Sequence, residues 1–318
     1  MNFVPSQSPA GGNPVRTAAD AGLAHRVWRH RHFYLFVSPF VVSFFVFGFY
    51  PLLYSLYLSF TKWDGLTPPV YVGLENFRTL FADGVFWSAA VNTLVIGAMY
   101  VVPMLGLAFL FAVLLDGPVK RFRAFFRAAV FIPGITPMVV VATVFMLFYG
   151  VEFGLLNFGL KWVGDRLGIA TSPIPWLGEA RWAQISVSIL LVWRWTGYNM
   201  VLMLAGLQNI PHELHESATI DGANAWHRLR HITLPLLRPT LIFCTIMSIV
   251  GTVYMFDEVF VLTQGGPGVA TTNLGLFLFD QSFGDFRFGY ASAAAYVTAA
   301  GAFALSMLVF RAGREGDR

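Results

Sequence analysis

The chain has 318 residues, of which 56% are hydrophobic and only 12% are charged, and phenylalanine alone supplies 32 positions. This composition excludes an ordinary water-soluble globule and predicts an integral membrane protein. The net charge of +4 is dispersed along the chain, which argues against a nucleic-acid-binding protein, and the single cysteine, Cys244, excludes a disulfide framework within the chain.

The N-terminal residues 1–31 are rich in Pro, Gly, Ala and Arg and are predicted to form a disordered tail. Apolar stretches then follow, each near the roughly 20 residues that a helix needs to cross a bilayer. Six such stretches are predicted to span: 33–60, 87–115, 126–150, 183–207, 239–262 and 288–310. The predicted fold is therefore an all-α membrane domain over residues 32–312, followed by a short tail, 313–318.

The basic residues predict the orientation of these spans. Fourteen of the 21 Lys and Arg residues lie in the two tails and in the connections after spans two and four, and only six lie in the other connections. The excess of positive charge on one side favours both termini in the cytoplasm. The first apolar run is also too long for the core of a signal peptide.

Proline residues occur inside several of the predicted spans. In a lipid environment the carbonyl groups that they free must be satisfied by neighbouring helices or by water, so kinked spans suggest a bundle with an interior path. Packing alone is the other interpretation. The prolines concerned are Pro39, Pro51, Pro103, Pro133 and Pro137.

No catalytic or metal site is predicted. The stretch from His212 to His215 resembles a zinc protease motif, but the two histidines are three residues apart and not four. His227 and His231 have the required spacing, yet the arginines between them favour a basic surface segment. No Walker-type phosphate-binding loop occurs, so any use of ATP requires another chain.

The longest polar connection, residues 208–238, is predicted to form two short helices at the cytoplasmic surface. Asn209 and Pro211 suggest the start of the first helix, and Asp221-Gly222 suggests its end. A second helix over Ala225–Leu229 is expected before Leu234-Pro235 turns the chain into the fifth span. From physical arguments alone, this element either docks onto another protein or rests on lipid headgroups.

Three motifs in this connection resemble a known family. Glu216-Ser217-Ala218, Asp221-Gly222-Ala223 and Ile232-Thr233-Leu234-Pro235 strongly resemble the cytoplasmic EAA loop of binding-protein-dependent ABC importer permeases. Ser217 departs from the usual Ala but is equally small. The resemblance implies a coupling helix that docks into a cleft of an ATPase subunit. It implies this coupling role for Glu213, Glu216, Ser217, Ala218, Asp221, Gly222 and Ala223.

Further stretches resemble the carbohydrate-uptake branch of these permeases and cover roughly residues 33–311. They are Tyr50-Pro51, Ser59-Phe60, 73–77, Asn92-Thr93, 205–207 and 261–267. The chain is similar to the larger maltose permease without its extra helices and outer domain. The resemblance implies a six-helix type I permease fold in a prokaryotic cytoplasmic membrane. The implied partners are a second permease subunit, two ATP-binding subunits that hold ATP and Mg, and an extracytoplasmic solute-binding protein; the chain itself needs no cofactor.

The fourth and fifth spans hold candidate residues for a substrate path. An arginine inside a span costs about 2.5 to 3.5 kcal/mol on insertion scales, so Arg194 is expected to face the interior of the bundle. It either contacts substrate, in which case its charge hints at an anionic cargo, or pairs with Asp257 or Glu258. A sugar path needs aromatic rings beside amide, hydroxyl and carboxylate groups. The residues of this type are Arg194, Tyr198, Asn199, Tyr254, Phe256 and Asp257.

Two other classes remain as alternatives to an importer subunit. An ATP-independent channel or secondary transporter would favour acidic residues or histidines along a pore, and an integral membrane enzyme would need a catalytic constellation. Neither explains the connection at 208–238. Two outer loops, 151–182 and 263–287, are expected either to contact the binding protein or, for their Trp residues, to anchor at the membrane interface.

Overall fold

The computed structural model describes residue 28, residues 31–117 and residues 122–315. It divides into two units, residues 1–55 and 56–318, and each is considered by itself. Nearly all of the predicted tail at 1–31, and residues 316–318 of the second tail, lie outside the described residues.

The first unit contains the first membrane-spanning helix up to Ser55. An α-helix passes through one π-helical turn and continues as an α-helix, which makes an apolar stretch of 29 residues from Arg31 to Ser59. Its three segments are α2 (Arg31–Phe44), η1 (Phe45–Phe49) and α3 (Tyr50–Ser59).

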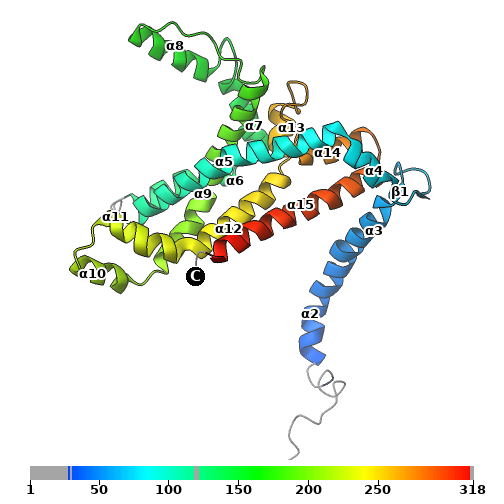
Figure 1. The fold of residues 1–318 in the computed structure, drawn as a ribbon, viewed down its shortest axis with the longest axis horizontal. Coiled ribbons are helices and arrows are strands. Elements are labelled where there is room, and N and C mark those ends of the chain that lie inside the picture. Colours follow the sequence, from blue (N-terminus) through cyan, green and yellow to red (C-terminus); the bar gives the residue numbers. More distant parts are fainter. Residues whose placement is uncertain (1–27, 29–30, 118–121, 316–318) are drawn as a thin grey trace, which may run out of the picture. The chain divides into compact units, whose positions relative to one another are not determined.

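The second unit is a helical bundle (Figure 1). Its long helices are α5 (Gly84–Asp116), α9 (Ala180–Gln208), α12 (Leu234–Val253) and α15 (Phe288–Glu315). The shorter helices are α4 (Glu75–Ala82), α6 (Arg123–Ile135), α7 (Met138–Phe148), α8 (Leu155–Leu167), α10 (His212–Ile220), α11 (Ala225–Arg228), α13 (Asp257–Leu262) and α14 (Leu274–Phe279). Two π-helical turns complete the list, η2 (Leu229–Thr233) and η3 (Asp280–Gly284).

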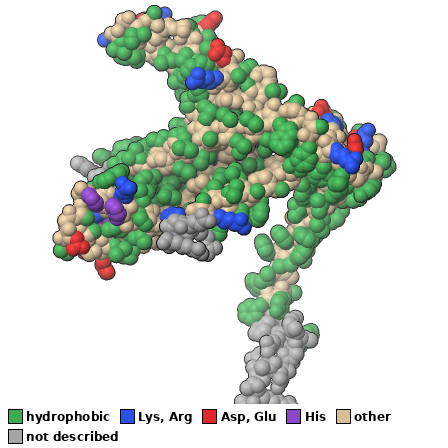
Figure 2. Space-filling view, in the orientation of Figure 1, with side chains coloured by type: hydrophobic (Ala, Val, Ile, Leu, Met, Phe, Trp, Pro, Cys, Tyr) green, Lys and Arg blue, Asp and Glu red, His purple; other side chains and the backbone are tan. Residues whose placement is uncertain are grey.

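The described residues confirm an all-helical membrane protein. They contain five helices that are long and apolar enough to cross a membrane, or six if one bent pair is counted as a single span. Hydrophobic side chains cover much of the visible surface of the long helices, as expected where lipid is the solvent (Figure 2). The only strands in the described part are β1 (Thr61–Lys62) and β2 (Val70–Tyr71), an antiparallel pair with Thr61 opposite Tyr71.

The third predicted span is not one straight helix. Helices α6 and α7 meet at an angle of 97°, with Thr136 and Pro137 at the break. Pro137 has no N–H to donate and disfavours helical backbone at Thr136, which adopts an extended conformation with ψ of 137°. The sequence indicated a kink here, but not a change of direction of this size.

The fifth predicted span, 239–262, is corrected in two ways. Helix α12 ends at Val253, and Asp257 and Glu258 begin the separate helix α13. The chain leaves the helix next to a tertiary contact. The buried side chain of Asn273 donates a hydrogen bond to the carbonyl of Met255, which replaces a hydrogen bond within the helix. Gly275 lies so close to the same carbonyl that a Cβ there would be 2.2 Å from its oxygen.

Glycine allows the spans to approach closely. Gly197 of α9 lies against the backbone of α6, where an added Cβ would be 1.9 Å from the carbonyl oxygen of Val130. Gly206, one turn before the end of α9, lies against Leu237 and Thr240 of α12. Small residues at helix contacts allow the close packing that stabilises membrane bundles.

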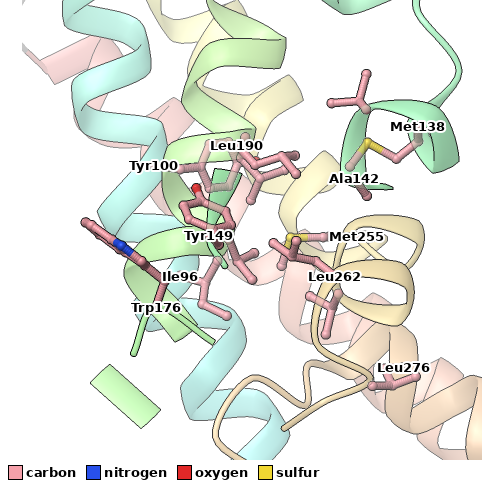
Figure 3. Close-up of a cluster of buried hydrophobic side chains, with 14 of the residues drawn as sticks. Ile96, Tyr100, Met138, Ala142, Tyr149, Trp176, Leu190, Met255, Leu262 and Leu276 are labelled. Carbon is pink, nitrogen blue, oxygen red and sulfur yellow. The ribbon is translucent and has the colours of Figure 1, made fainter. Parts of the chain in front are cut away.

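The largest buried cluster joins several helices around the first half of α9. It brings together side chains from α5, α7, α9, α13 and α14, including Tyr149 and Trp176 (Figure 3). The hydroxyl of Tyr149 donates to the carbonyl of Ser186 at 2.8 Å, and the hydroxyl of Ser186 donates to the carbonyl of Trp176 at 3.0 Å. The outer loop before α9 is therefore anchored to the bundle by both packing and hydrogen bonds.

Candidate functional site

The six residues predicted for the substrate path all line one cavity of about 480 Å³. Three of them lie on α9, and the others lie in the non-helical segment after α12 and at the start of α13. Asn199 is buried, whereas the side chains of Tyr198 and Tyr254 are largely open to the cavity side. The structure thus brings together residues that are about 60 positions apart in the chain.

Arg194 supports the bend between α6 and α7. Its Nη1 donates a hydrogen bond of 2.7 Å to the carbonyl of Thr136, which lies in the break and has no helical partner of its own. The guanidinium carbon also lies 5.4 Å from the centre of the Trp195 ring. The ion pair with Asp257 or Glu258 that the sequence left open is not formed; the ion pair found between two described residues joins Arg123 and Asp116.

The Nε atom of Arg194 is buried and has no hydrogen-bond partner among the described residues. A buried N–H of a charged group that lacks a partner costs free energy. Arg194 therefore uses Nη1 to bond to the backbone of the bend, while its Nε donates no hydrogen bond to the described residues.

Two carboxylates border the same cavity. Asp257 and Glu258 occupy the first turn of α13, where the positive end of the helix favours negative charge. Glu258 is only 8% exposed, which places it deeper than the sequence suggested. The titratable side chains lining the cavity are thus two carboxylates, one guanidinium and three tyrosines, Tyr100, Tyr198 and Tyr254.

Sequence reasoning missed Tyr100 and Ser248 as lining residues. The hydroxyl of Tyr100 on α5 is 2.7 Å from that of Thr252 and donates to the carbonyl of Ser248 at 3.1 Å, so it ties α5 to α12. A signal was present, because Ser248 and Thr252 are four residues apart in an otherwise apolar span and so share a helix face. Tyr100, Met138 and Met255 belong to both the cavity wall and the buried cluster (Figure 3).

The predicted coupling residues form a second site at the opposite end of α9, on and after α10 (Figure 1). The motif Asp221-Gly222-Ala223 closes α10 with a Schellman cap. The N–H of Ala223 donates to the carbonyl of Ala218 at 2.8 Å, and the N–H of Gly222 donates to that of Thr219 at 3.1 Å. Gly222 has φ of +81°, a conformation that requires glycine at this position.

Helix α10 presents two different faces. Leu214, Ser217, Ala218 and Asp221 share one face by helical spacing. On the other side, Glu216 and Ile220 line a groove of about 710 Å³ between α10, α11 and the end of α5. Of the seven predicted coupling residues, five are exposed, and Ala218 and Ala223 are half-buried.

The second short helix predicted in this connection is not separate. Helix α11, η2 and α12 run on as one helix of 29 residues, Ala225–Val253, so Leu234-Pro235 makes no turn. Pro235 is accommodated in the first turn of α12, directly after the π-helical turn. Asn209 does not begin α10 either: it ends α9, and Pro211 precedes α10.

Hydrogen bonds tie α10 to this long helix. The guanidinium of Arg228 donates to the hydroxyl of Thr219, and that hydroxyl donates to the carbonyl of His215. The side chain of Asn224 caps α11 by accepting from the N–H of His227 at 2.9 Å. The same continuous helix carries Ser248 and Gly251, which line the cavity, so the two sites share one rigid element.

Comparisons with known proteins agree with this architecture. Residues 104–313 match the family model described as binding-protein-dependent transport system inner membrane component. The lactose transport system permease protein LacF of Rhizobium radiobacter is 36% identical over 285 residues, covering 89% of this chain and 94% of that protein. The trehalose/maltose transport system permease protein MalF of Thermococcus litoralis is 35% identical, covering 81% of this chain and 86% of that protein.

A solved structure shares the fold. A chain of a bacterial ABC transporter involved in the import of the acidic polysaccharide alginate matches with a TM-score of 0.79 at 22% identity, over 92% of this chain and 98% of that one. The family match also confirms the predictions of an inner-membrane, multi-pass and non-catalytic component. This chain belongs to the family of inner membrane components of binding-protein-dependent transport systems.

Proposed function

We propose that the chain is one of two permease subunits of an ATP-driven importer for a neutral sugar or short oligosaccharide. In this proposal the cavity contacts the sugar, α10 docks onto a separate ATPase subunit that holds ATP and Mg, and a solute-binding protein delivers the cargo. The observation that carries the proposal is the continuous helix from Ala225 to Val253, which joins the proposed docking site to the proposed sugar site.

The lining of the cavity supports a sugar as cargo. Aromatic rings of Trp195, Tyr198, Tyr254 and Phe256 lie around it beside the amide of Asn199 and the two carboxylates. Sugars present apolar ring faces that stack on aromatics and hydroxyls that bond to carboxylates and amides. Its volume falls within the roughly 300–1,000 Å³ typical of small-molecule sites. The names of the relatives point the same way, since they include lactose, arabinooligosaccharide and trehalose/maltose permeases.

The charges around the cavity favour a neutral cargo over an anionic one. Two carboxylates face one guanidinium, and that guanidinium already donates one hydrogen bond to the carbonyl of Thr136. The carboxylate of Asp257 offsets the charge of Arg194, so the lining offers an anionic sugar no net positive charge. The presence of Arg194 alone is therefore a poor argument for acidic cargo.

The geometry of α10 supports the proposed coupling role. One face of the helix carries the exposed residues Leu214, Ser217 and Asp221. Ala218 lies on the same face and is half-buried, and the small side chains of Ser217 and Ala218 suit close approach to a cleft of a partner. Ile220 is 87% exposed and Trp226 is 64% exposed, although both lie on a polar segment outside the membrane spans. Movement of α10 would pass through the Arg228–Thr219 hydrogen bond and along the continuous helix, about 1.5 Å of length per residue, to the cavity.

The sugar site is tested in proteoliposomes that contain the complete transporter. Asn199→Ala or Tyr254→Ala should weaken apparent affinity by roughly fivefold to tenfold, the loss of about 1 kcal/mol for a hydrogen bond or a stacked ring. Phe303→Ala, a change of an exposed aromatic on α15, is the matched control and should transport normally. Wild-type affinity and selectivity in both cavity variants would remove the cavity from the path.

The coupling role is tested separately by association with the ATPase. Glu216→Lys or Ala218→Trp should release the ATPase subunit during purification and abolish uptake, whereas Glu152→Lys, an exposed carboxylate near α8, should do neither. Uptake against a gradient without any ATPase subunit would instead favour a secondary transporter.

A further inference from the structure

Helix α8, at the other end of α9 from α10, carries an apolar surface that no described element covers. Its polar residues Asn157, Lys161 and Asp165 are spaced four apart and form one narrow stripe. The rest of the helix circumference is mostly apolar, with Arg166 as its one charged residue. This apolar arc comprises Leu155, Leu156, Phe158, Leu160, Trp162, Val163 and Leu167, and all of them are 36% to 68% exposed.

Asn157 fixes which way the arc faces. Its side-chain nitrogen donates to the carbonyls of Val151 and Ile174 at 3.0 and 2.9 Å, and its side-chain oxygen accepts from the N–H of Ile174 and from the indole of Trp176, both at 3.1 Å. Trp176 is itself buried in the main cluster. Asn157 is thus held toward the loop that leads into α9, and the apolar arc lies on the opposite side of α8.

The arc continues the exposed apolar surface of a predicted membrane span. Helix α7, the second half of the bent span, has exposed apolar side chains, and Leu147 near its end is 70% exposed. Beyond it Val151 is 45% and Phe153 is 93% exposed. Only residues 149–154 separate α7 from α8, and six residues reach at most about 20 Å, so α8 cannot leave the neighbourhood of the bilayer surface.

The charged residues of α8 suit the headgroup region of a bilayer. The guanidinium carbon of Arg166 lies 5.1 Å from the centre of the Trp162 ring, and Lys161 precedes that tryptophan. Tryptophan prefers the membrane interface, and basic side chains beside it attract lipid phosphates. Figure 2 shows hydrophobic surface over this helix together with basic side chains.

We propose that α8 lies in the bilayer interface on the side opposite α10, with its apolar arc inserted at the boundary between headgroups and acyl chains. A water-soluble binding protein fits this surface less well, because non-obligate protein interfaces are only about as apolar as the rest of a protein surface. Seven neighbouring apolar side chains form a larger patch than a surface in water normally tolerates. The proposal does not depend on which solute is carried.

The test uses the complete transporter in liposomes that contain phosphatidylglycerol. In a Cys244→Ala background, a single cysteine replaces Val163 or Leu167 of the apolar arc, or Asp165 of the polar stripe as the matched control, and is labelled with an environment-sensitive NBD fluorophore. Lipids with a nitroxide high on the acyl chain should quench the labels at 163 and 167 at least about twofold more than the label at 165, and aqueous iodide should show the reverse order.

Three results would overturn the proposal. Equal iodide quenching at all three positions would leave α8 in water. Shielding of positions 163 and 167 that appears only when the solute-binding protein is added would make the arc a docking surface for that protein. Shielding from both iodide and lipid nitroxides without the binding protein would mean that another subunit covers it. None of these readouts requires transport, so failure here and failure of the proposed function are distinguishable.

Discussion

The cap at Gly222 links the geometry of α10 most directly to coupling. Its φ of +81° lies in the left-handed region, and no atom lies within 4 Å of the place where a Cβ would be. Gly222→Ala therefore meets no clash, and its cost is conformational, about 1–2 kcal/mol. Asparagine tolerates this conformation better than alanine, whereas proline requires φ near −65° and also removes the N–H that donates to Thr219.

The loss of cap stability is therefore expected to be smallest for Gly222→Asn, larger for Gly222→Ala and largest for Gly222→Pro. A cost of 1–2 kcal/mol corresponds to a roughly 5- to 30-fold larger population of opened cap, which hydrogen exchange of the α10 amides should report directly. If an intact cap is needed for coupling, uptake and stimulated ATPase activity in proteoliposomes should fall in the same order, and Gly222→Pro should lose nearly all uptake.

Gly168 provides a matched control. It ends α8 with φ of +68° and likewise has no atom within 4 Å of an added Cβ. Gly168→Ala should carry the same local cost and leave ATPase stimulation unchanged. Full uptake by Gly222→Pro would refute a mechanical role for the cap, and equal loss in Gly168→Ala would show that the effect is one of general stability.

Three further substitutions test the packing and hydrogen bonds that hold the sites in place. Arg194→Met removes the donor to the carbonyl in the bend between α6 and α7 and should lower the free energy of unfolding by about 1–3 kcal/mol. Arg194→Lys should restore part of this loss. Thermal unfolding in detergent measures both variants, and an unchanged Tm would contradict the role of Arg194 in supporting the bend. Asn157→Asp keeps the acceptor but loses the donor to two carbonyls, so it should lower Tm and raise exchange of the α8 amides, while indifference at both readouts would show that the amide does not position α8. Gly197→Ala places a Cβ 1.9 Å from a carbonyl oxygen of α6 and should cost about 1–3 kcal/mol or more, whereas Gly106→Ala, with no atom within 4 Å, should be tolerated; similar Tm values for the two variants would contradict the close contact.

Much of this protein could be predicted from its sequence because the bilayer imposes a strong constraint. A segment that crosses hydrocarbon must be apolar and helical, so composition located the first, second, fourth and sixth spans to within about five residues, whereas the third is bent and the fifth has different ends. That the six polar and aromatic candidates would line one cavity could also be anticipated, because polar side chains inside spans are rare and tend to face the interior of the bundle. The end of α10 at Asp221-Gly222 could be predicted as well, because glycine adopts the left-handed backbone conformation found there without strain.

The tertiary structure decided where helices break and which residues meet. Apolar periodicity continues through Tyr254–Phe256, and only the hydrogen bond from Asn273 to Met255 explains why α12 stops there. Conversely, Leu234-Pro235 looks like a stop, yet a π-helical turn lets the helix continue through it. That Arg194 bonds to the backbone of a bent span, and not to a carboxylate, depends on a partner 58 residues away, and such long-range contacts are not encoded in any local pattern.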